Sequence, residues 1–520
     1  MRIRRGGSIA ALVVLMALSV VAAACTSAGS EGDGGVPEAG AEAPPTTAPI
    51  EWPTPTFVEG ACPMPLDDVD VEVTCGTVDV PENRLDPESA TITLAVARLH
   101  ARTEAPEPDP VVQLQGGPGF PSLEDVATYA EASLLDERDY VLWDQRGLGF
   151  STPNLDCPEV NVAIWQTFET ADEATEEQAV IEEAGRSCRK RLVDDGVDLA
   201  GYTTTQNAAD LADLRVALDV DEWNLRAISY GSALAIETVR NHPEGLRSVL
   251  LDSVVPPDAA FGGVDRGRSA VAALEELYAA CADDEACATT YGPLEDLFTE
   301  AAAVLDEEPY RTTVEDPATG EDHEVQITGQ DLWAGLFNAL YDETLIPVLP
   351  SVGKAIVDGN VAVIDPVAQD GIPFAAGQAE AMTLSVDCAD RQDLMDAAEV
   401  EPFLAEHPEL ATLVRLTLPE ETCPEWDVPS APAPFGELLG EDTEVPILVM
   451  AGRFDPITPV AGTRRVAEAL GTDLLLFPAA GHGAVTSGDC PRTIWFAFLD
   501  DPAQAPDTAC MDELGPPDFL

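Results

Sequence analysis

Lysine is almost absent from this sequence of 520 residues. Lys190 and Lys354 are the only two, and 26 basic residues face 95 acidic ones, which gives a formal net charge of −69. A field of this sign repels the phosphates of nucleic acids and the headgroups of anionic lipids. We therefore expect no nucleic-acid partner. Salt-adapted and highly soluble exported proteins both have such a composition.

The patterns that bind metals are also missing. The chain has five histidines, and none of its eleven cysteines lies in a Cys-x-x-Cys pair or beside histidines at the spacing of zinc ligands. We expect no metal site. Proton transfer and oxyanion binding can be done by protein groups alone, so no cofactor is called for.

No apolar run is long enough to cross a bilayer. The N-terminal run, Ile9 to Val21, falls short of the roughly 20 residues that a spanning helix requires. Arginines precede this run and the small residues Ala22 to Ala24 follow it. Residues 1–24 are therefore expected to form a secretory signal peptide.

Cys25 directly follows these alanines. The context resembles a bacterial lipobox, in which Cys25 is lipidated and becomes the mature N-terminus; ordinary signal cleavage after Ala24 is the alternative. Residues 25–57 are rich in Gly, Ala, Glu, Pro and Thr and have little to bury, so we expect a flexible tether. The protein would be exported, and either lipid-anchored to the outer face of the cell membrane or secreted.

The remaining ten cysteines form an even number, which is typical of disulfides in an oxidising compartment. Sequence alone does not fix their connectivity. Pairing between neighbours would staple short surface excursions. The pairs would be Cys62 with Cys75, Cys157 with Cys188, Cys281 with Cys287, Cys388 with Cys423, and Cys490 with Cys510.

A strand-like run that ends at Ile228 breaks into Ser229-Tyr230-Gly231-Ser232 and then into a helix-like run. At such a tight turn the serine hydroxyl is exposed above the sheet, and the next N–H is free to meet an oxyanion. The turn also requires small residues two before and two after the serine, here Ala227 and Gly231. Ser229 is the candidate nucleophile, and Ala227 stands where glycine is usual.

A serine hydroxyl becomes a good nucleophile when a histidine takes its proton. His482 directly follows the apolar run Leu474 to Phe477 and lies in a Gly-His-Gly loop. A loop at the carboxyl end of a strand is where sheet enzymes keep their chemistry. His482 is therefore the candidate base. The other four are interpreted as surface or packing residues: His100, His242, His323 and His407.

The carboxylate that orients this histidine should come between serine and histidine in the chain. Asp455 fits, because it follows the apolar run Val445 to Ala451 and precedes the strand that leads to His482. Asp252 is the rival, since it follows the run Arg247 to Leu251 in the same way. Asp455 is preferred.

Upstream, the apolar run Val111 to Leu114 opens into Gln115-Gly116-Gly117-Pro118-Gly119. Glycines let backbone N–H groups face a ligand without a Cβ in the way. We expect the N–H of Gly117 to be one donor to the oxyanion and the N–H of Tyr230 to be the other.

Strand-like and helix-like segments alternate from Thr91 to Val255, which predicts an α/β fold with a parallel sheet and crossover helices. A largely helical insert over residues 256–431 separates this half of the core, residues 58–255, from its last part, residues 432–520. Inserts in this place commonly form a lid over the active site. Helices are expected at Ala270 to Ala280, Leu294 to Leu305 and Asp331 to Tyr341.

Five motifs in this order resemble the proline iminopeptidase and tripeptidyl aminopeptidase branch of the α/β-hydrolases (peptidase family S33), in its secreted actinobacterial form. They are Gln115 to Gly119, Asp144 to Ser151, Ser229 to Gly231, Asp455 to Pro459, and Gly481 to Gly483. The likeness runs from about Cys62 to Cys510. It implies an α/β-hydrolase fold with a mostly parallel central sheet, a tripeptidyl-aminopeptidase-like C-terminal domain, and a triad of Ser229, Asp455 and His482. Gln115 departs from the family, because many relatives have histidine there.

Other charged residues near these motifs have different expected roles. Asp144 and Arg146 are interpreted as a buried ion pair that holds two loops in place. An aminopeptidase must also bind the ammonium group of its substrate, so a carboxylate of the lid should reach the cleft. Asp387 and Asp390, which flank Cys388, are the candidates.

Three functions are compatible with these residues. The resemblance implies a serine exopeptidase that cleaves peptides from a free N-terminus through an acyl-enzyme on Ser229. A carboxylesterase or lipase-like hydrolase would use the same triad on a small ester and would need no acid for an amine. A non-catalytic binding protein is disfavoured, because serine, acid, histidine and glycine loop are all present.

Overall fold

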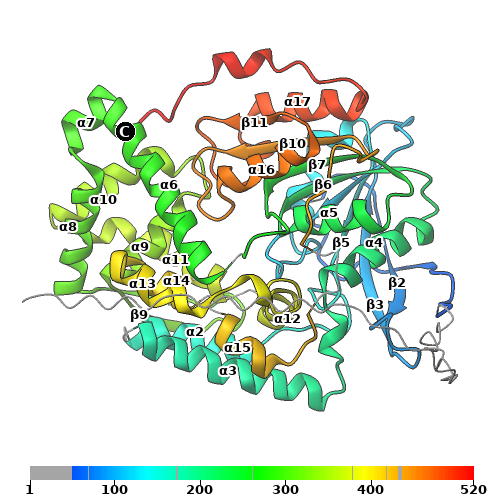
Figure 1. The fold of residues 1–520 in the computed structure, drawn as a ribbon, viewed down its shortest axis with the longest axis horizontal. Helices are drawn as coiled ribbons and strands as arrows, with labels where there is room; N and C mark the ends of the chain where they lie inside the picture. Colours follow the sequence, from blue (N-terminus) through cyan, green and yellow to red (C-terminus); the bar gives the residue numbers. More distant parts are fainter. Residues whose placement is uncertain are drawn as a thin grey trace, which may run out of the picture. The chain divides into compact units, whose positions relative to one another are not determined.

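A nine-stranded sheet forms the centre of the computed structural model (Figure 1), with the order β1-β2-β3-β5-β4-β6-β7-β10-β11. The first three strands pair antiparallel, and the strands from β5 to β11 are parallel. The strands are β1 Phe57–Gly60, β2 Val73–Pro81, β3 Thr91–Leu99, β4 Val111–Leu114, β5 Tyr140–Trp143, β6 Trp223–Ser229, β7 Leu246–Val254, β10 Ile447–Gly452 and β11 Leu474–Phe477.

The structure describes residues 50–520 apart from 68, 171–173, 261, 377–378, 417–418 and 431–435. Residues 50–520 form one compact unit. The expected signal peptide, Cys25 and most of the expected tether lie outside the described residues. Within the described part, no helix combines the length and apolarity needed to traverse a membrane.

The parallel strands are buried on both faces, as the near-continuous apolar runs of β4 and β7 require. One face packs against α4 (Thr204–Ala217), α5 (Tyr230–Asn241) and α16 (Val460–Leu470). The other face packs against α1 (Val126–Ala130) and α17 (Asp489–Asp500). The predicted α/β-hydrolase architecture with a mostly parallel sheet is confirmed. All active-site motifs lie at carboxyl ends of the central strands.

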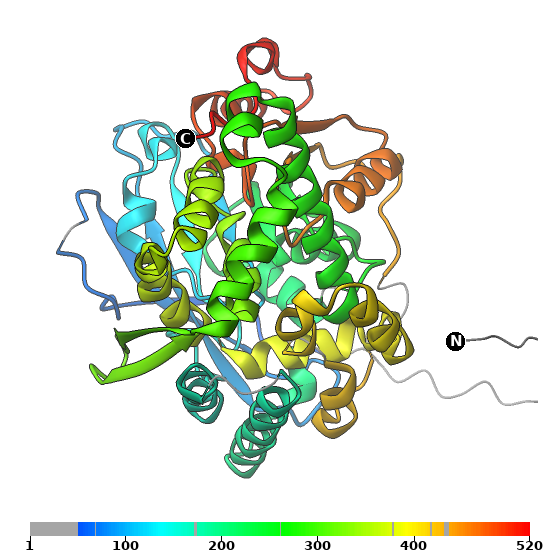
Figure 2. The same cartoon turned by 90° about the vertical axis from the view of Figure 1, so that its left-hand side faces the viewer.

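Between β7 and β10 the chain forms a mostly helical insert, called the lid below (Figure 2). Its elements are α6 Gly263–Asp283, α7 Glu285–Tyr291, α8 Leu294–Glu307, β8 Tyr310–Glu315, β9 Asp322–Ile327, α9 Gly329–Ala339, α10 Leu349–Val357, α11 Asp365–Ala376, α12 Glu380–Asp390, α13 Val400–Glu406, α14 Ala411–Arg415 and α15 Pro419–Trp426. The three expected helices fall within α6, α8 and α9 or end two residues beyond them.

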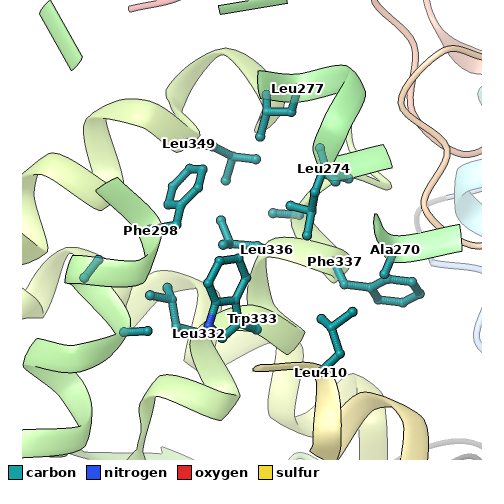
Figure 3. Packing of buried hydrophobic residues seen from close by; sticks show 14 of the residues in the cluster. Ala270, Leu274, Leu277, Phe298, Leu332, Trp333, Leu336, Phe337, Leu349 and Leu410 are labelled. Carbon is teal, nitrogen blue, oxygen red and sulfur yellow. The ribbon is translucent and has the colours of Figure 1, made fainter. Parts of the chain in front are cut away.

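The lid has its own hydrophobic core (Figure 3), in which Leu274 and Leu277 of α6 pack with Phe298 of α8 and Trp333 of α9. Apolar residues recur every three or four positions along these helices, so each helix has one apolar face, and these faces pack together as a bundle. The β8-β9 hairpin was not predicted. Two further helices, α2 (Pro158–Thr170) and α3 (Ala174–Asp194), lie between β5 and β6 in the chain. They pack on the lid elements β9, α12 and α15.

Five disulfides join the ten cysteines in the expected neighbour pairs: Cys62–Cys75, Cys157–Cys188, Cys281–Cys287, Cys388–Cys423 and Cys490–Cys510. The fourth bond ties α12 to α15, and the second ties the start of α2 to α3. Both lie in the lid side of the molecule. These bonds restrict the motion of the elements that they join.

Candidate active site

Ser229 ends β6 at a strained backbone conformation, with φ 56° and ψ −129°, and α5 begins at the next residue. A Cβ on Gly231 would lie 2.0 Å from the carbonyl oxygen of Leu114, so only glycine fits there. Ala227, in contrast, is fully buried within β6 between the neighbouring strands β4 and β7. The sheet therefore accommodates its methyl group. Strain of this kind persists where the surrounding structure enforces it, and it is common at active sites.

Asp455 and His482 are in direct contact, with 2.9 Å between Oδ2 of the aspartate and Nδ1 of the imidazole. Asp455 is 3% exposed. Its Oδ1 accepts the backbone N–H groups of Ile457 and Thr458 at 3.0 and 2.8 Å, and its Oδ2 accepts the hydroxyl of Thr458 at 2.5 Å. The carboxylate is thus held in one orientation, which is the requirement for directing an imidazole.

The pKa values of the pair are shifted in opposite directions. Burial acts to raise the pKa of Asp455, but the charge and hydrogen bond of His482 and the donors of Thr458 outweigh it and lower that pKa. Burial acts to lower the pKa of His482, but Asp455, with a further contribution from Asp252, raises it above the usual value. The pair therefore favours an imidazolium, which is the form that a general base adopts during attack.

The loop that carries His482 lies against the elbow of Ser229. Gly483 has φ 86°, and a Cβ on it would lie 2.7 Å from Cδ1 of Ile228, the residue before Ser229. On the lid side, the N–H of His482 donates to the carbonyl oxygen of Tyr341 at 3.0 Å, and the two rings lie 4.8 Å apart. His482 is therefore held between the elbow and the end of α9.

The glycine loop lies on the other side of Ser229. A Cβ on Gly116 would be 2.7 Å from Cβ of Ser229, and Gly117 has φ 114°, a conformation that favours glycine. Tyr230 is the first residue of α5, where backbone N–H groups have no partner within the helix. The structure thus brings the segments of both expected oxyanion donors next to Ser229.

Gln115 does not face a free cleft. Its side-chain oxygen accepts the hydroxyl of Tyr129 at 3.1 Å and the side-chain N–H of Gln113 at 3.1 Å. Its backbone oxygen accepts from Gln145 at 3.1 Å.

Asp144 and Arg146 are both fully buried, but they do not pair with each other, which corrects the expectation. Asp144 accepts the backbone N–H groups of Ser122, Leu123 and Phe150 at 2.8 to 2.9 Å. Arg146 instead forms a two-pronged ion pair with Asp210, with both contacts at 2.7 Å. Each of the two side chains thus holds its own set of loops.

The lid brings α12 to the glycine loop, because the N–H of Ala379 donates to the carbonyl oxygen of Gly119 at 3.1 Å. Glu380 follows directly as the first residue of α12, and Asp387 lies two turns further on the same helix. Both side chains are half-buried. Among the described residues, neither carboxylate has a cation within ion-pair distance. We call Glu380 and Asp387 the acidic pair.

Burial, and then the charge of Asp387, raises the pKa of Glu380 to about 7, while Arg266 opposes the shift. Burial raises the pKa of Asp387 to about 6, against the opposing charges of Arg391 and Arg266. Arg266 lies on α6, with its guanidinium 5.6 Å from the ring centre of Phe337, and its buried Nε has no hydrogen-bond partner in the described structure. Neither carboxylate thus has an ion-pair partner in the described structure, although the charge of Arg266 acts on both and that of Arg391 acts on Asp387.

Asp390, the other expected amine-binding residue, belongs to a different network. Its Oδ2 accepts the hydroxyl of Thr204 at 2.5 Å, and Thr204 shares a 2.9 Å contact with the hydroxyl of Tyr230. Burial raises the pKa of Asp390 to about 7. This carboxylate therefore links the end of α12 to α4 and α5.

Neither Glu380 nor Thr458 was predicted from the sequence as a site residue. The seven-residue spacing of Glu380 and Asp387 places them on one helix face and was a readable signal. Thr458 carried no such signal, because its contact depends on the turn after Asp455. In the described ranges, His, Cys, Asp and Glu do not gather in groups of three that could hold a metal ion.

Comparison with known proteins gives two family matches. A family described as alpha/beta hydrolase fold matches residues 109–348, and one described as TAP-like protein matches residues 412–510. The chain is similar to serine protease Hip1 of Mycobacterium tuberculosis, with 24% identity over 442 residues, 80% of this chain and 82% of the relative. Carboxylesterase B of the same species is 25% identical over 82% of this chain and 84% of its own.

A third relative is similar over a shorter stretch. Tripeptidyl aminopeptidase of Streptomyces coelicolor is 29% identical over 196 residues, which is 36% of each chain.

Proposed function

This chain belongs to the TAP-like α/β-hydrolases and is a serine hydrolase, and we propose that it is an exopeptidase that cleaves peptides from the free N-terminus through an acyl-enzyme on Ser229. The feature of the molecule that carries the proposal is the acidic pair of α12 beside the glycine loop. A positively charged substrate N-terminus is the ligand that two such carboxylates lack.

The proposed chemistry follows from the contacts around Ser229. His482 takes the hydroxyl proton as Oγ attacks the peptide carbonyl carbon, and Asp455 stabilises the imidazolium that forms. The N–H groups of Gly117 and Tyr230 receive the negative oxygen. The imidazolium then gives its proton to the leaving amine, and water repeats the sequence to release the acyl portion and restore Ser229.

The acidic pair provides the amine specificity in this proposal. A raised pKa means that ionising either carboxylate costs free energy when no cation is bound. A substrate ammonium supplies the missing counter-charge and restores both anions, so part of the burial cost is recovered on binding. Arg266 alone lies close enough to oppose the shift in both carboxylates, and it limits their mutual repulsion before substrate arrives.

The location of the pair also fits cleavage near the N-terminus. Ala379, the residue before Glu380, bonds to the same glycine loop whose Gly116 touches Ser229. An ammonium held by α12 would therefore place a nearby peptide bond over Ser229. Asp390, which is bonded to Thr204, acts in this proposal as a support for α12, and Asp387 takes the amine-binding role expected from the sequence.

A carboxylesterase is the second candidate, because carboxylesterase B resembles this chain over more than four-fifths of its length. It would use the same triad on a small ester. It would leave the acidic pair without a role in the reaction.

Export is supported by the five disulfides, since such bonds persist in oxidising compartments. We propose that the enzyme acts outside the cell membrane, either lipid-anchored through Cys25 or released. Peptides in that space are its proposed substrates.

The test compares three substrates at pH 7.5: a peptide anilide with a free amine, its N-acetylated form, and a small p-nitrophenyl ester. We expect the wild type to prefer the free-amine peptide strongly, and we expect Ser229→Ala to lose all activity. Glu380→Gln and Asp387→Asn should lose the preference but retain ester hydrolysis. Asp393→Asn, an exposed acid just after α12, is the matched control and should behave as wild type.

Equal turnover of free and acetylated peptides by the wild type would reject the exopeptidase. Ester hydrolysis without peptide hydrolysis would establish the second candidate instead. Full activity of Ser229→Ala would remove the triad from the mechanism.

A further inference from the structure

The three backbone N–H groups that follow His482 donate hydrogen bonds to two adjacent side chains of β7. Gly483 donates to Oγ of Ser253 at 2.8 Å, Ala484 donates to Oδ1 of Asp252 at 2.9 Å, and Val485 donates to Oδ2 of the same carboxylate at 2.8 Å. We call Asp252 and Ser253 the cradle. Both residues are fully buried.

The cradle occupies a special point of the sheet. Asp252 pairs with Ile228 on β6 and with Met450 on β10, so it lies between the strand that ends at Ser229 and the strand that leads to Asp455. The register shifts at the next step, where Ser229 pairs with Val254 and Ser253 is left as an extra residue. Such bulges re-aim side chains beside active sites.

Backbone strain also marks this position. Ser253 has φ 55°, a left-handed conformation that is unfavourable for a residue with a Cβ. The bulge and the strain turn the Ser253 hydroxyl to the N–H of Gly483, the residue directly after His482. A buried strand end without this role would require neither the strain nor three remote backbone partners.

We propose that Asp252 and Ser253 are positioning residues of the hydrolytic reaction: they fix the backbone of residues 483–485 so that the imidazole of His482 stays aligned between Asp455 and Ser229, and the charge of Asp252 stabilises the imidazolium. Asp252, the alternative to Asp455 in the sequence, thus acts on His482 through the loop of residues 483–485. Neither residue touches the substrate. This role rests on the proposed function of His482 as the general base, and it applies to every substrate because the amine of a peptide takes no part in it.

The charges around the cradle are consistent with this role. Arg226 of β6 is the cation that faces Asp252, and it also donates to Gln113 and to the hydroxyl of Tyr140. Asp455 contacts His482 directly. Burial raises the pKa of Asp252 to about 6, against the opposing contributions of Val485, Arg226, His482 and Ala484. Asp252 is thus ionised above about pH 6 and accepts both N–H groups there.

The test measures kcat/KM for the small ester as a function of pH in two cradle variants. Asp252→Asn keeps the shape of the side chain but loses its charge and one acceptor, so kcat/KM should fall by about 10- to 100-fold. In this variant the acid limb of the profile of kcat/KM against pH should move to lower pH, because the loss of one negative charge near the imidazole lowers the pKa of His482. Ser253→Ala removes a neutral acceptor, so kcat/KM should fall by about five- to tenfold with the limb unmoved.

Ser248→Ala is the matched control, since Ser248 is a buried serine of the same strand whose hydroxyl bonds to Asn224 at 2.7 Å, away from the His482 loop. It should lower Tm and leave kcat/KM unchanged. Wild-type kcat/KM in both cradle variants, or an equal loss in Ser248→Ala, would overturn the proposal. An acid limb that does not move in Asp252→Asn would overturn the electrostatic part. If Asp252→Asn does not fold, Ser253→Ala decides the positioning role alone.

Discussion

Recognition of a substrate amine by the acidic pair should depend on pH in a way that ester hydrolysis does not. The pKa of Glu380 is about 7 and that of Asp387 is about 6. From these values, the fraction of enzyme with both carboxylates ionised falls about tenfold between pH 7 and pH 6. The α-amine of a peptide, with a pKa of roughly 7.7 to 8.0, stays mostly protonated over that interval.

The assay is the ratio of kcat/KM for a free-amine peptide anilide to kcat/KM for its N-acetylated form. His482 titrates in both reactions, so its contribution cancels from the ratio. In the wild type the ratio should fall about tenfold from pH 7 to pH 6, because only the free amine needs the acidic pair.

Glu380→Gln supplies the perturbation. A hydrogen bond between charged groups contributes about 1.5 to 3 kcal/mol, so at pH 7.5 the ratio should drop by about tenfold or more. Only Asp387 then titrates, and the ratio should change by about twofold between pH 7 and pH 6. A wild-type ratio that is flat with pH, or a Glu380→Gln ratio equal to that of the wild type, would refute the assignment of the acidic pair.

Three further outcomes are expected. Asp455→Asn should lower kcat about 10³- to 10⁴-fold with Tm little changed, because the amide no longer selects the required tautomer of the imidazole; ester hydrolysis with CD-monitored melting checks this. Tm should rise as the pH falls from 8 to about 5.5. The reason is that Asp252 and Asp390 have folded-state pKa values raised to about 6 and 7, so the folded protein binds protons more tightly than the unfolded chain does. A Tm that falls over this range would contradict the burial of these acids. Replacing Cys388 and Cys423 by serine should lower Tm, and it should reduce hydrolysis of the free-amine peptide more than hydrolysis of the ester, because this disulfide holds α12. An equal loss of activity on both substrates would contradict a role of the disulfide in positioning the acidic pair.

The central sheet and the triad segments could be predicted because their signals are local. Val111–Leu114 and Leu474–Phe477 are strands in the structure with the bounds that their apolar runs indicate. Ser229 and Asp455 each follow such a run, and the carboxyl ends of parallel strands meet at one edge of a sheet. Local periodicity thus contained most of the information about the core.

The lid could not be predicted in the same way, because its arrangement depends on contacts between distant helices. Trp165 of α2 lies in the hydrophobic core of the lid, although the strands β6 and β7 separate it from α6 in the chain. Asp144 and Arg146 show the same limit at short range. Their proximity in sequence indicated an ion pair, whereas the fold gives each a separate set of partners.

The groups around Ser229 together define a narrow working range for a peptide substrate. As the proposed general base, His482 must be neutral to accept a proton, and its pKa is raised, so activity on any substrate should increase as the pH rises past that pKa. Glu380 and Asp387 must be ionised, which also requires a pH near or above 7. The substrate amine must still be protonated, which sets an upper bound of roughly pH 8.

The two proposed activities therefore diverge on the alkaline side. Free-amine peptides should show a bell-shaped kcat/KM with its maximum between about pH 7 and pH 8, because deprotonation of the amine removes the partner of the acidic pair. Acetylated peptides and esters carry no such amine, so their kcat/KM should reach a plateau and stay there up to about pH 9. Parallel profiles for the three substrates would mean that the cleft does not recognise the charge of the N-terminus, and the acidic pair would then have no part in substrate selection.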